Sequence, residues 1–449
     1  MKHKELSLAT NQLLTSFILA ILTLEGSSAW AATPKYRALY RFQTGSDGGF
    51  PNGNLVLDAS GNLYGTTSRG GIVQCAGDGG IVGCGIVFEL SPPASGGRAW
   101  TKTTLYAFSG GTDGATPYDG PILDKAGNLY GTTAIGGTGQ CKNSNGTVIG
   151  CGTVFEIAPT GSSGSGWSET ILYSFQGQNS NGDGAYPFAG LVADRTGNLY
   201  GTTLGGGTSG GTVFKLTRPS RGGGVWTETV LYTAGSEASG FYARLILDGA
   251  GNLYTTSATG GTDFAGTVFE LSPPRWTPTI LHSFNFKNGG TTPTTGVIFD
   301  NKGNLYGTTI YGGVNNPICG GLGCGVAFRL TPPGGRDGGW TETVIHSFQG
   351  RGDGFIPGGC VILDQAGNIY GSTVYGGLNV EDGYGIVYKL TPRSKKDRFA
   401  KTIVHYFADH PAEYPSGNLV FEKSGAIYGA TALGDSSAPG GVVFKLTVD

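Results

Sequence analysis

Acidic residues recur at one position of a repeated motif, and they are the first residues of this chain that could do chemistry. The set is Asp58, Asp124, Asp194, Asp248, Asp300, Asp364 and Glu422. Brought together, such carboxylates could form a ring of metal ligands. Most of them, however, open a D-x-x-G-N sequence, in which Asp bonds the backbone two residues on and Gly supplies a positive φ. We therefore interpret these acids as hairpin-turn residues and predict neither a metal site nor a cofactor.

Histidine is the usual candidate for acid–base catalysis near neutral pH. Three histidines share a strand position that tyrosine occupies in other copies of the motif unit, namely His282, His346 and His405. This substitution pattern predicts a structural role. His410 differs, because it stands in a loop with Asp409 and Glu413, although charged loop residues are usually just solvated. The chain has no Ser elbow, no pair of metal-binding histidines and no phosphate loop, so we predict no catalytic residue.

Six of the seven cysteines form three local pairs, namely Cys75 with Cys84, Cys141 with Cys151, and Cys319 with Cys324. Each second Cys is followed by Gly and then by an apolar strand. In an exported protein this placement predicts three loop disulfides. A zinc site is the alternative, but it needs further His or Cys ligands, and none is close in sequence. Cys360 is left over inside an apolar strand, which predicts a buried, inert thiol.

These residues are spaced by a repeat. The sequence Gly-Asn-Leu-Tyr-Gly-Thr-Thr at 61–67 returns in identical or closely related form at 127–133, 197–203, 251–256, 303–309 and 367–373, and a weaker copy occupies 425–431. Self-similarity at such a period indicates one structural unit repeated around a ring or along a solenoid.

Each unit predicts four short antiparallel strands, which we name a to d in chain order. In the first unit, strand a is 54–58, strand b is 63–67 and strand c is 86–90, and a lone strand d at 36–42 precedes them. The last unit has only a, b and c, so the first strand can complete its sheet. This 3+1 closure predicts a seven-bladed β-propeller over residues 32–449 without a free sheet edge. An open solenoid would leave a terminal sheet unpaired.

The recurring D-x-x-G-N-L-Y-G-T-T, followed by Gly-Gly and G-x-V-F-x-L, resembles the GloVer tandem-repeat family of exported bacterial proteins over residues 36–449. It resembles more distantly the two-component-regulator propeller repeats. The first resemblance implies a secreted repeat protein, often with a C-terminal anchor, but no anchor is visible here. The family has no agreed activity, so no catalytic residue can be transferred.

The N-terminus predicts a signal peptide over residues 1–31. Lys2 and Lys4 precede an apolar run at 13–24, and Ala29-Trp30-Ala31 supplies a cleavage site. An uncleaved anchor is the alternative, although the run is shorter than a spanning helix of about 20 residues. The net charge is −2 without a basic stripe, which argues against nucleic acid as a partner. We expect a secreted or periplasmic monomer without a membrane anchor.

Propeller topology predicts a candidate ligand site, because the b–c and d–a loops open on one face. Aromatic residues gather in these loops: Phe50, Tyr186, Phe241, Tyr242, Tyr311, Tyr375 and Tyr414. The alternative for each of them is packing between blades. We expect the second residue of each strand a to set the mouth of the central channel: Asn54, Gly120, Gly190, Arg244, Gly296, Cys360 and Asn418.

Arg244 is the only charged residue of this ring. A guanidinium in such a place suits a carboxylate or another anionic group of a ligand. The alternative is that Arg244 pairs with a nearby acid, for which Glu237 on its own d–a loop is the candidate. The two interpretations predict different effects of removing the side chain.

Taken together, these patterns favour a non-catalytic secreted module that binds a glycan, a peptide or a protein. One alternative is a propeller-fold lyase or hydrolase with its site at the channel mouth. Another is a structural surface or matrix protein. Near-equivalence of the seven units favours binding, since an enzyme usually breaks the symmetry with a few convergent polar residues.

Overall fold

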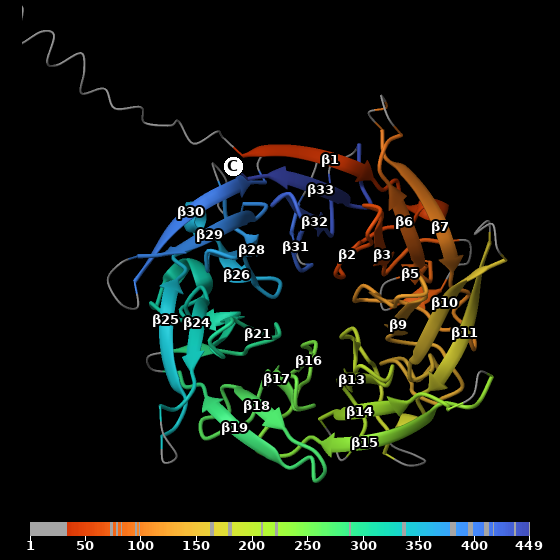
Figure 1. The fold of residues 1–449 in the computed structure, drawn as a ribbon, viewed down its shortest axis with the longest axis horizontal. Helices are drawn as coiled ribbons and strands as arrows, with labels where there is room; N and C mark the ends of the chain where they lie inside the picture. The colour runs from red at the N-terminus through yellow and green to blue at the C-terminus, as the bar shows by residue number, and fades with distance from the viewer. Residues whose placement is uncertain are drawn as a thin grey trace, which may run out of the picture.

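The structure is a computed structural model that describes residues 34–448, apart from 72–74, 78–79, 82, 95–96, 98, 162–165, 178–181, 208–209, 221–222, 287–288, 335–337, 378–382, 394–397, 408–412, 416 and 435–436. Seven antiparallel sheets are arranged in a ring (Figure 1). The predicted seven-bladed β-propeller is thereby confirmed. The predicted signal peptide and the pair Asp409 and His410 lie outside the described residues.

Every blade contains the four predicted strands, with strand a innermost. The strands a are β2 (Val56–Leu57), β8 (Ile122–Leu123), β12 (Val192–Ala193), β16 (Ile246–Leu247), β21 (Ile298–Phe299), β27 (Ile362–Leu363) and β31 (Val420–Phe421). The strands b are β3 (Leu63–Thr67), β9 (Leu129–Thr133), β13 (Leu199–Thr203), β17 (Leu253–Ser257), β22 (Leu305–Thr309), β28 (Ile369–Tyr375) and β32 (Ile427–Thr431).

The outer half of each blade is formed by strands c and d. The strands c are β6 (Ile86–Ser91), β10 (Thr153–Thr160), β14 (Thr212–Thr217), β18 (Thr267–Leu271), β24 (Val326–Thr331), β29 (Ile386–Pro392) and β33 (Val442–Thr447). The strands d are β7 (Thr101–Ala107), β11 (Gly166–Ser174), β15 (Thr227–Thr233), β19 (Pro278–Ser283), β25 (Thr341–Ser347), β30 (Phe399–Tyr406) and β1 (Lys35–Arg41).

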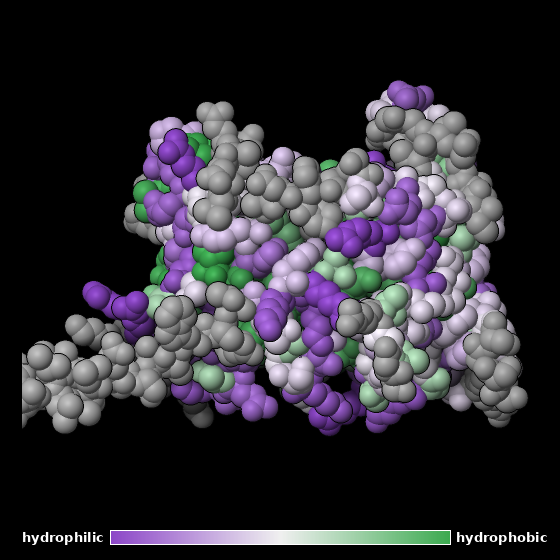
Figure 2. Space-filling model, turned by 90° about the horizontal axis from the view of Figure 1, so that it is seen from above, coloured by the Kyte–Doolittle hydropathy of each residue, from purple (hydrophilic) through white to green (hydrophobic). Residues whose placement is uncertain are grey.

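Short elements decorate the loops. β4 (Ala76–Gly77) pairs with β5 (Gly80–Ile81), β20 (Gly290–Thr291) with β23 (Tyr311–Gly312), and β26 (Phe355–Pro357) with β28. Single 3₁₀ turns occupy Gly45–Asp47, Pro317–Cys319 and Arg351–Asp353. From the side, hydrophilic residues cover much of the visible surface and hydrophobic residues appear in smaller patches (Figure 2).

The ring closes as predicted. β1 pairs antiparallel with β33, and Tyr36 lies opposite Leu446. Figure 1 shows β1 outermost beside β33, so the first described strand completes the last sheet. The pairing hydrogen-bonds the outer edge of β33 to β1, and an open solenoid is excluded.

Strand a is two residues long rather than the predicted five, because its end residues have other partners. Asp58 accepts hydrogen bonds from the N–H groups of Ser60 and Asn62, each at 2.8 Å. Its second oxygen accepts from Asn62 Nδ2 at 2.9 Å and from the Tyr64 hydroxyl at 3.3 Å. The same bonds recur in the next five blades, so these aspartates are turn residues, as the motif predicted.

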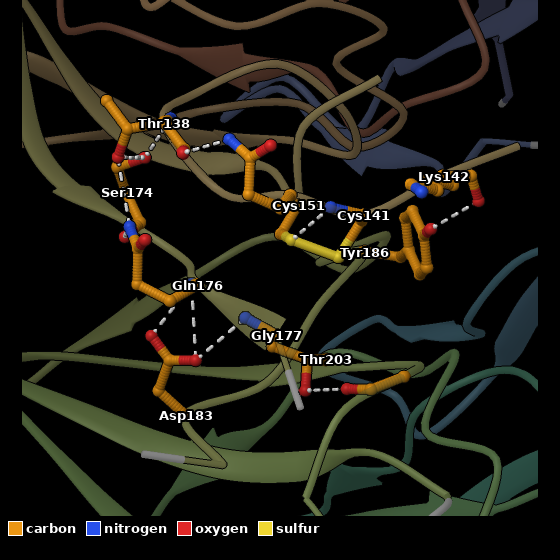
Figure 3. The surroundings of a disulfide bond; sticks show 12 residues. Thr138, Cys141, Lys142, Cys151, Ser174, Gln176, Gly177, Asp183, Tyr186 and Thr203 are labelled. Atoms are coloured by element: carbon orange, nitrogen blue, oxygen red, sulfur yellow. Dashed lines mark hydrogen bonds between the residues drawn. A yellow bond between two sulfur atoms is a disulfide. The ribbon is translucent and has the colours of Figure 1, made fainter. Parts of the chain in front are cut away.

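The three predicted disulfides are present, with Cα–Cα distances of 5.1, 5.0 and 5.3 Å, and Cys360 is the free cysteine. Figure 3 shows the Cys141–Cys151 bond and, nearby, the hydrogen bonds between Gln176 and Asp183. Disulfides persist in oxidising compartments, so they indicate an extracytoplasmic location. Within the described part of the chain, we find no helix with the length and apolarity of a membrane span.

Outer strands are tied to the d–a loops by a tyrosine or histidine and an acid. The Tyr106 hydroxyl donates to Asp113 at 3.0 Å, and His346 Nε2 lies 3.1 Å from Asp353 at the equivalent place. His405 instead stacks on Tyr36 at 4.5 Å between ring centroids, and burial lowers its pKa to about 4. The predicted structural role of the strand histidines agrees with these contacts.

At the joints between blades, a charged residue of the next blade lies opposite several of these loop acids. This residue is a lysine at some joints and a glutamate at another. Lys102 Nζ lies 3.0 Å from Asp47, and Lys401 pairs with Asp353 in the same way. At the corresponding position of β11 stands Glu169, whose Oε1 is buried without a hydrogen-bond partner among the described residues. Burial, and then the charge of Asp113, raise the pKa of Glu169 to about 7. This joint therefore contains two carboxyl groups where others have an ion pair.

We expect removal of β1 to expose β33 as a sheet edge and to lower the stability of the propeller. A chain that begins at Phe42 lacks β1, whereas a chain that begins at Pro34 keeps it and serves as the control. Thermal denaturation and light scattering should show a lower Tm and aggregation for the shorter chain. Equal Tm values for the two chains would contradict the closure.

We expect the Glu169 joint to weaken as the pH rises. Its folded-state pKa lies above the unfolded value, so its stabilisation is complete below about pH 4 and is lost as the pH passes about 7. Glu169→Lys should create an ion pair with Asp113 and raise the unfolding free energy at pH 8 by about 1 kcal/mol, a value reduced by solvent screening.

Denaturant titrations at pH 5 and pH 8 measure this difference, with Thr170→Lys on the exposed side of the same strand as the matched control. If Glu169→Lys raises the unfolding free energy equally at both pH values, or if the control variant raises it as much, the carboxyl groups of the joint do not titrate as described.

Candidate binding site at the channel mouth

A girdle of hydrogen bonds runs from blade six through blades seven, one, two and three to blade four at the channel mouth, at or beside the predicted ring positions. Asn418 Oδ1 accepts from the Cys360 N–H, and Asn54 Oδ1 accepts from the Asn418 N–H at 3.1 Å. Asp119 continues the girdle, since its Oδ1 accepts from the Asn54 N–H at 3.0 Å and its Oδ2 from the Gly190 N–H at 2.7 Å. Side chains thus bind the inner backbone edges of neighbouring blades to one another.

Arg244 joins this girdle through Asp119. Its Nε donates to Asp119 Oδ2 at 3.2 Å, and its Nη2 donates to the Gly120 carbonyl at 2.8 Å. The guanidinium reaches from blade four past blade three to blade two, and a Cβ on Gly190 would collide with it. The expected pairing with an acid is present, but the acid is Asp119 rather than Glu237.

Asp119 is a residue of the site that the sequence pattern did not lead us to identify. It precedes Gly120, and the residues at the equivalent position in other blades are uncharged: Gly53, Ala189, Ala243, Thr295, Gly359 and Gly417. The sequence does contain a signal for this residue. Asp119 is the only acid at its repeat position, and the next repeat position contains a single arginine, Arg244. Asp119 and Arg244 neutralise each other, with 15% and 21% of their side chains exposed.

Cys360 lies in the channel wall rather than in the interior of its sheet. The residue is partly exposed and lines the mouth cavity. Burial, and then the negative charge of Asp119, raise the pKa of the Cys360 thiol to about 11. The thiol is therefore protonated near neutral pH, and the predicted inertness is consistent with this environment.

A cavity of about 680 Å³ occupies the mouth. Of the sequence-predicted residues, nine line it: Arg244, Asn54, Asn418, Gly296, Cys360, Phe50, Tyr242, Tyr375 and Tyr414. Phe241, which is fully buried, Tyr186 and Tyr311 do not. The Tyr186 hydroxyl donates to the Lys142 carbonyl beside the Cys141–Cys151 disulfide (Figure 3), and Tyr311 pairs with Thr291 in a small loop sheet.

Two further aromatic residues complete the wall. Tyr118 and Phe188 line the cavity with ring centroids 4.6 Å apart. With Tyr242 they occupy the same position in three consecutive blades, two residues before the ring position. They were missed in the sequence because each loop was considered separately. The aromatic wall therefore lies over the blades that hold Asp119 and Arg244.

Backbone geometry holds two of the aromatic residues that line the cavity in place. Phe50 and Tyr414 have positive φ values of 60° and 58°, and each precedes a proline. The Phe50 N–H donates to the Gly440 carbonyl of the preceding blade at 2.8 Å, and the Tyr414 N–H to the Tyr384 carbonyl at 2.9 Å. These strained residues join blades through their backbones, while their side chains line the cavity.

Comparison with solved structures finds propellers of low similarity. A candidate 6-phosphogluconolactonase from Bacteroides uniformis is 12% identical, with a TM-score of 0.46 and coverage of 80% of this chain and 95% of that one. A gluconolactonase from Xanthomonas campestris is 13% identical, with a TM-score of 0.35 and coverage of 73% and 91%. A Dyadobacter fermentans protein of unknown function is 12% identical, with a TM-score of 0.42 and coverage of 92% and 98%.

No curated protein matches the chain. A family model, described as the Gloeobacter/Verrucomicrobia repeat, matches residues 72–321, which is more than half of the 449 residues. This agrees with the resemblance indicated by the D-x-x-G-N-L-Y-G-T-T motif. The chain belongs to the Gloeobacter/Verrucomicrobia repeat family.

Proposed function

We propose that this protein is an exported, non-catalytic carbohydrate-binding propeller that takes a neutral saccharide at its channel mouth. The observation that carries the proposal is the lining of the mouth cavity, in which six aromatic residues stand with amide side chains around one internally neutralised ion pair. A pocket that is mostly apolar and has a few fixed polar groups is the usual form of a small-molecule site.

The chemistry of the lining favours a sugar. Pyranose rings present C–H groups on one face and hydroxyls at the edge, so they match aromatic faces beside hydrogen-bonding groups. Tyr118, Phe188 and Tyr242 supply the aromatic faces on one side. Asn52 and Thr294 stand at the equivalent position in the flanking blades and supply polar groups.

The charge balance favours a neutral ligand over an acidic one. Arg244 already faces the carboxylate of Asp119, so an anionic group would have to compete with an ion pair that is largely shielded from solvent. Breaking such a pair leaves an uncompensated charge, which is costly. The sequence-based expectation of an anionic ligand group at Arg244 is therefore not the one we propose.

The arrangement of Asp119 supports binding rather than hydrolysis. Glycoside hydrolysis generally needs two carboxyl groups that flank the scissile bond and exchange protons with it. Both oxygens of Asp119 accept hydrogen bonds, from three backbone N–H groups and from Arg244. A carboxylate engaged in this way serves the wall of the channel.

We expect Tyr118→Ala and Phe188→Ala each to weaken binding of a neutral oligosaccharide by at least about fivefold, since an aromatic contact contributes about 1 kcal/mol beyond its buried area. Neutral and acidic glycans on an array identify the ligand, and calorimetry then measures the affinities. Phe264→Ala is the matched control, because Phe264 is 67% exposed and does not line the cavity.

The proposal fails if the protein binds only acidic glycans, or if the two variants bind as tightly as the control. Arg244→Ala separates the roles further. It should lower the Tm, because it leaves Asp119 without its cation, and unchanged stability with lost binding of an acidic glycan would instead assign Arg244 to an anionic ligand.

A further inference from the structure

A second cavity, of about 450 Å³, lies along the inner strands of blades two to four. Apart from Arg244, every residue that lines it is aliphatic, and these residues come from β8, β12 and β16 and the positions just before them: Ile122, Leu123, Leu191, Val192, Ala193, Leu245, Ile246 and Leu247. The mouth cavity above is lined by aromatic and amide groups. The polarity of the channel wall therefore changes along its length.

The size of one side chain explains why the cavity lies at these blades. Ala193 ends the inner strand of blade three, and the other six blades have a larger residue at that position: Leu57, Leu123, Leu247, Phe299, Leu363 and Phe421. Ala193 is exposed, whereas its neighbour Val192 is partly buried. The small side chain of Ala193, at a position where the other blades have large side chains, leaves the space that forms the cavity.

Arg244 connects the two cavities, since it lines both. Gly190, in the same blade as Ala193, has no side chain and so leaves room for the guanidinium to lie along the wall. Blade three thus has small residues at two positions, one at the level of the girdle and one in the aliphatic section. The two cavities therefore adjoin at Arg244, beside these small residues.

We propose that the saccharide bound at the mouth carries an alkyl or acyl chain, and that this chain occupies the aliphatic cavity beside Ala193. The inference rests on the proposed function and specifies its ligand as an amphiphile with a neutral sugar head. An aliphatic wall gains nothing from hydrogen bonding with water, and each buried CH₂ group strengthens binding by about fourfold when it leaves water completely. A free saccharide would leave this section unused.

The test measures how tightly the full mature chain binds methyl, hexyl and octyl β-D-glucoside. Each glucoside is used below the concentration at which it forms micelles. Calorimetry should show tighter binding with chain length, with octyl at least about tenfold tighter than methyl glucoside. Ala193→Phe should abolish this gain and leave the affinity for methyl glucoside unchanged. The fold accepts phenylalanine at this position, because Phe299 and Phe421 stand there in blades five and seven.

Leu363→Phe is the matched control, because it makes a similar change at the equivalent position of blade six, outside the aliphatic cavity. The Leu363→Phe variant should still bind the glucosides more tightly as the alkyl chain lengthens. Equal affinities of the three glucosides, or a gain that survives Ala193→Phe, overturn the inference. Absence of binding by all three glucosides overturns it as well, whereas the oligosaccharide array tests the mouth site separately.

Discussion

The structure depends on one packing interaction that recurs between blades, in which an aromatic ring of strand c lies over a residue of strand b, usually glycine, and against an aromatic ring of the preceding blade. Phe88 packs against Phe42 in this way, and all seven such ring pairs have centroids between 5.1 and 5.7 Å apart. A Cβ on Gly65 would lie only 2.6 Å from Phe88. This explains why the motif favours glycine between its tyrosine and its threonines.

Blade four shows that the interaction, rather than the motif, is what the fold maintains. There Thr255 replaces the glycine, and Ala234 replaces the aromatic residue at the end of the preceding strand. Phe241, from the loop that follows, fills the vacancy and packs against Phe269, and it is fully buried. The loop of this unit is unusual because it supplies the missing ring, and the next position on the same loop is Tyr242, which faces the mouth.

The proposed binding site lies where the repeats differ. Asp119, Ala193 and Arg244 each depart from their columns, and all lie in blades two to four. The girdle and the joints made by residues with positive φ hold the inner strands at fixed positions, so single side chains can shape the cavities between them. A binding site supported by rigid strands holds its groups more precisely than one built on free loops.

The sequence by itself determined the number of blades, the strand order, the closure, the turns and the three disulfides, and it pointed to four of the six aromatic residues that line the mouth cavity. It could do so because these features depend on contacts that are local or repeat with the period of the motif. Asp58 bonds residues two to six positions away, and each cysteine pair is separated by ten residues or fewer. Arg244 and Asp119 each stand out at their repeat positions, but the pairing between them is not a local feature.

Only the tertiary structure decided that Arg244 pairs with Asp119, 125 residues earlier, because the guanidinium reaches past Gly190 of blade three to blade two. The same arrangement placed Tyr118, Phe188 and Tyr242 on one wall and turned Tyr186 toward the disulfide. It also made Ala193 significant, since the space left by a small side chain depends on the residues of neighbouring blades. Such properties arise from distances between blades, which a pattern within one repeat does not contain.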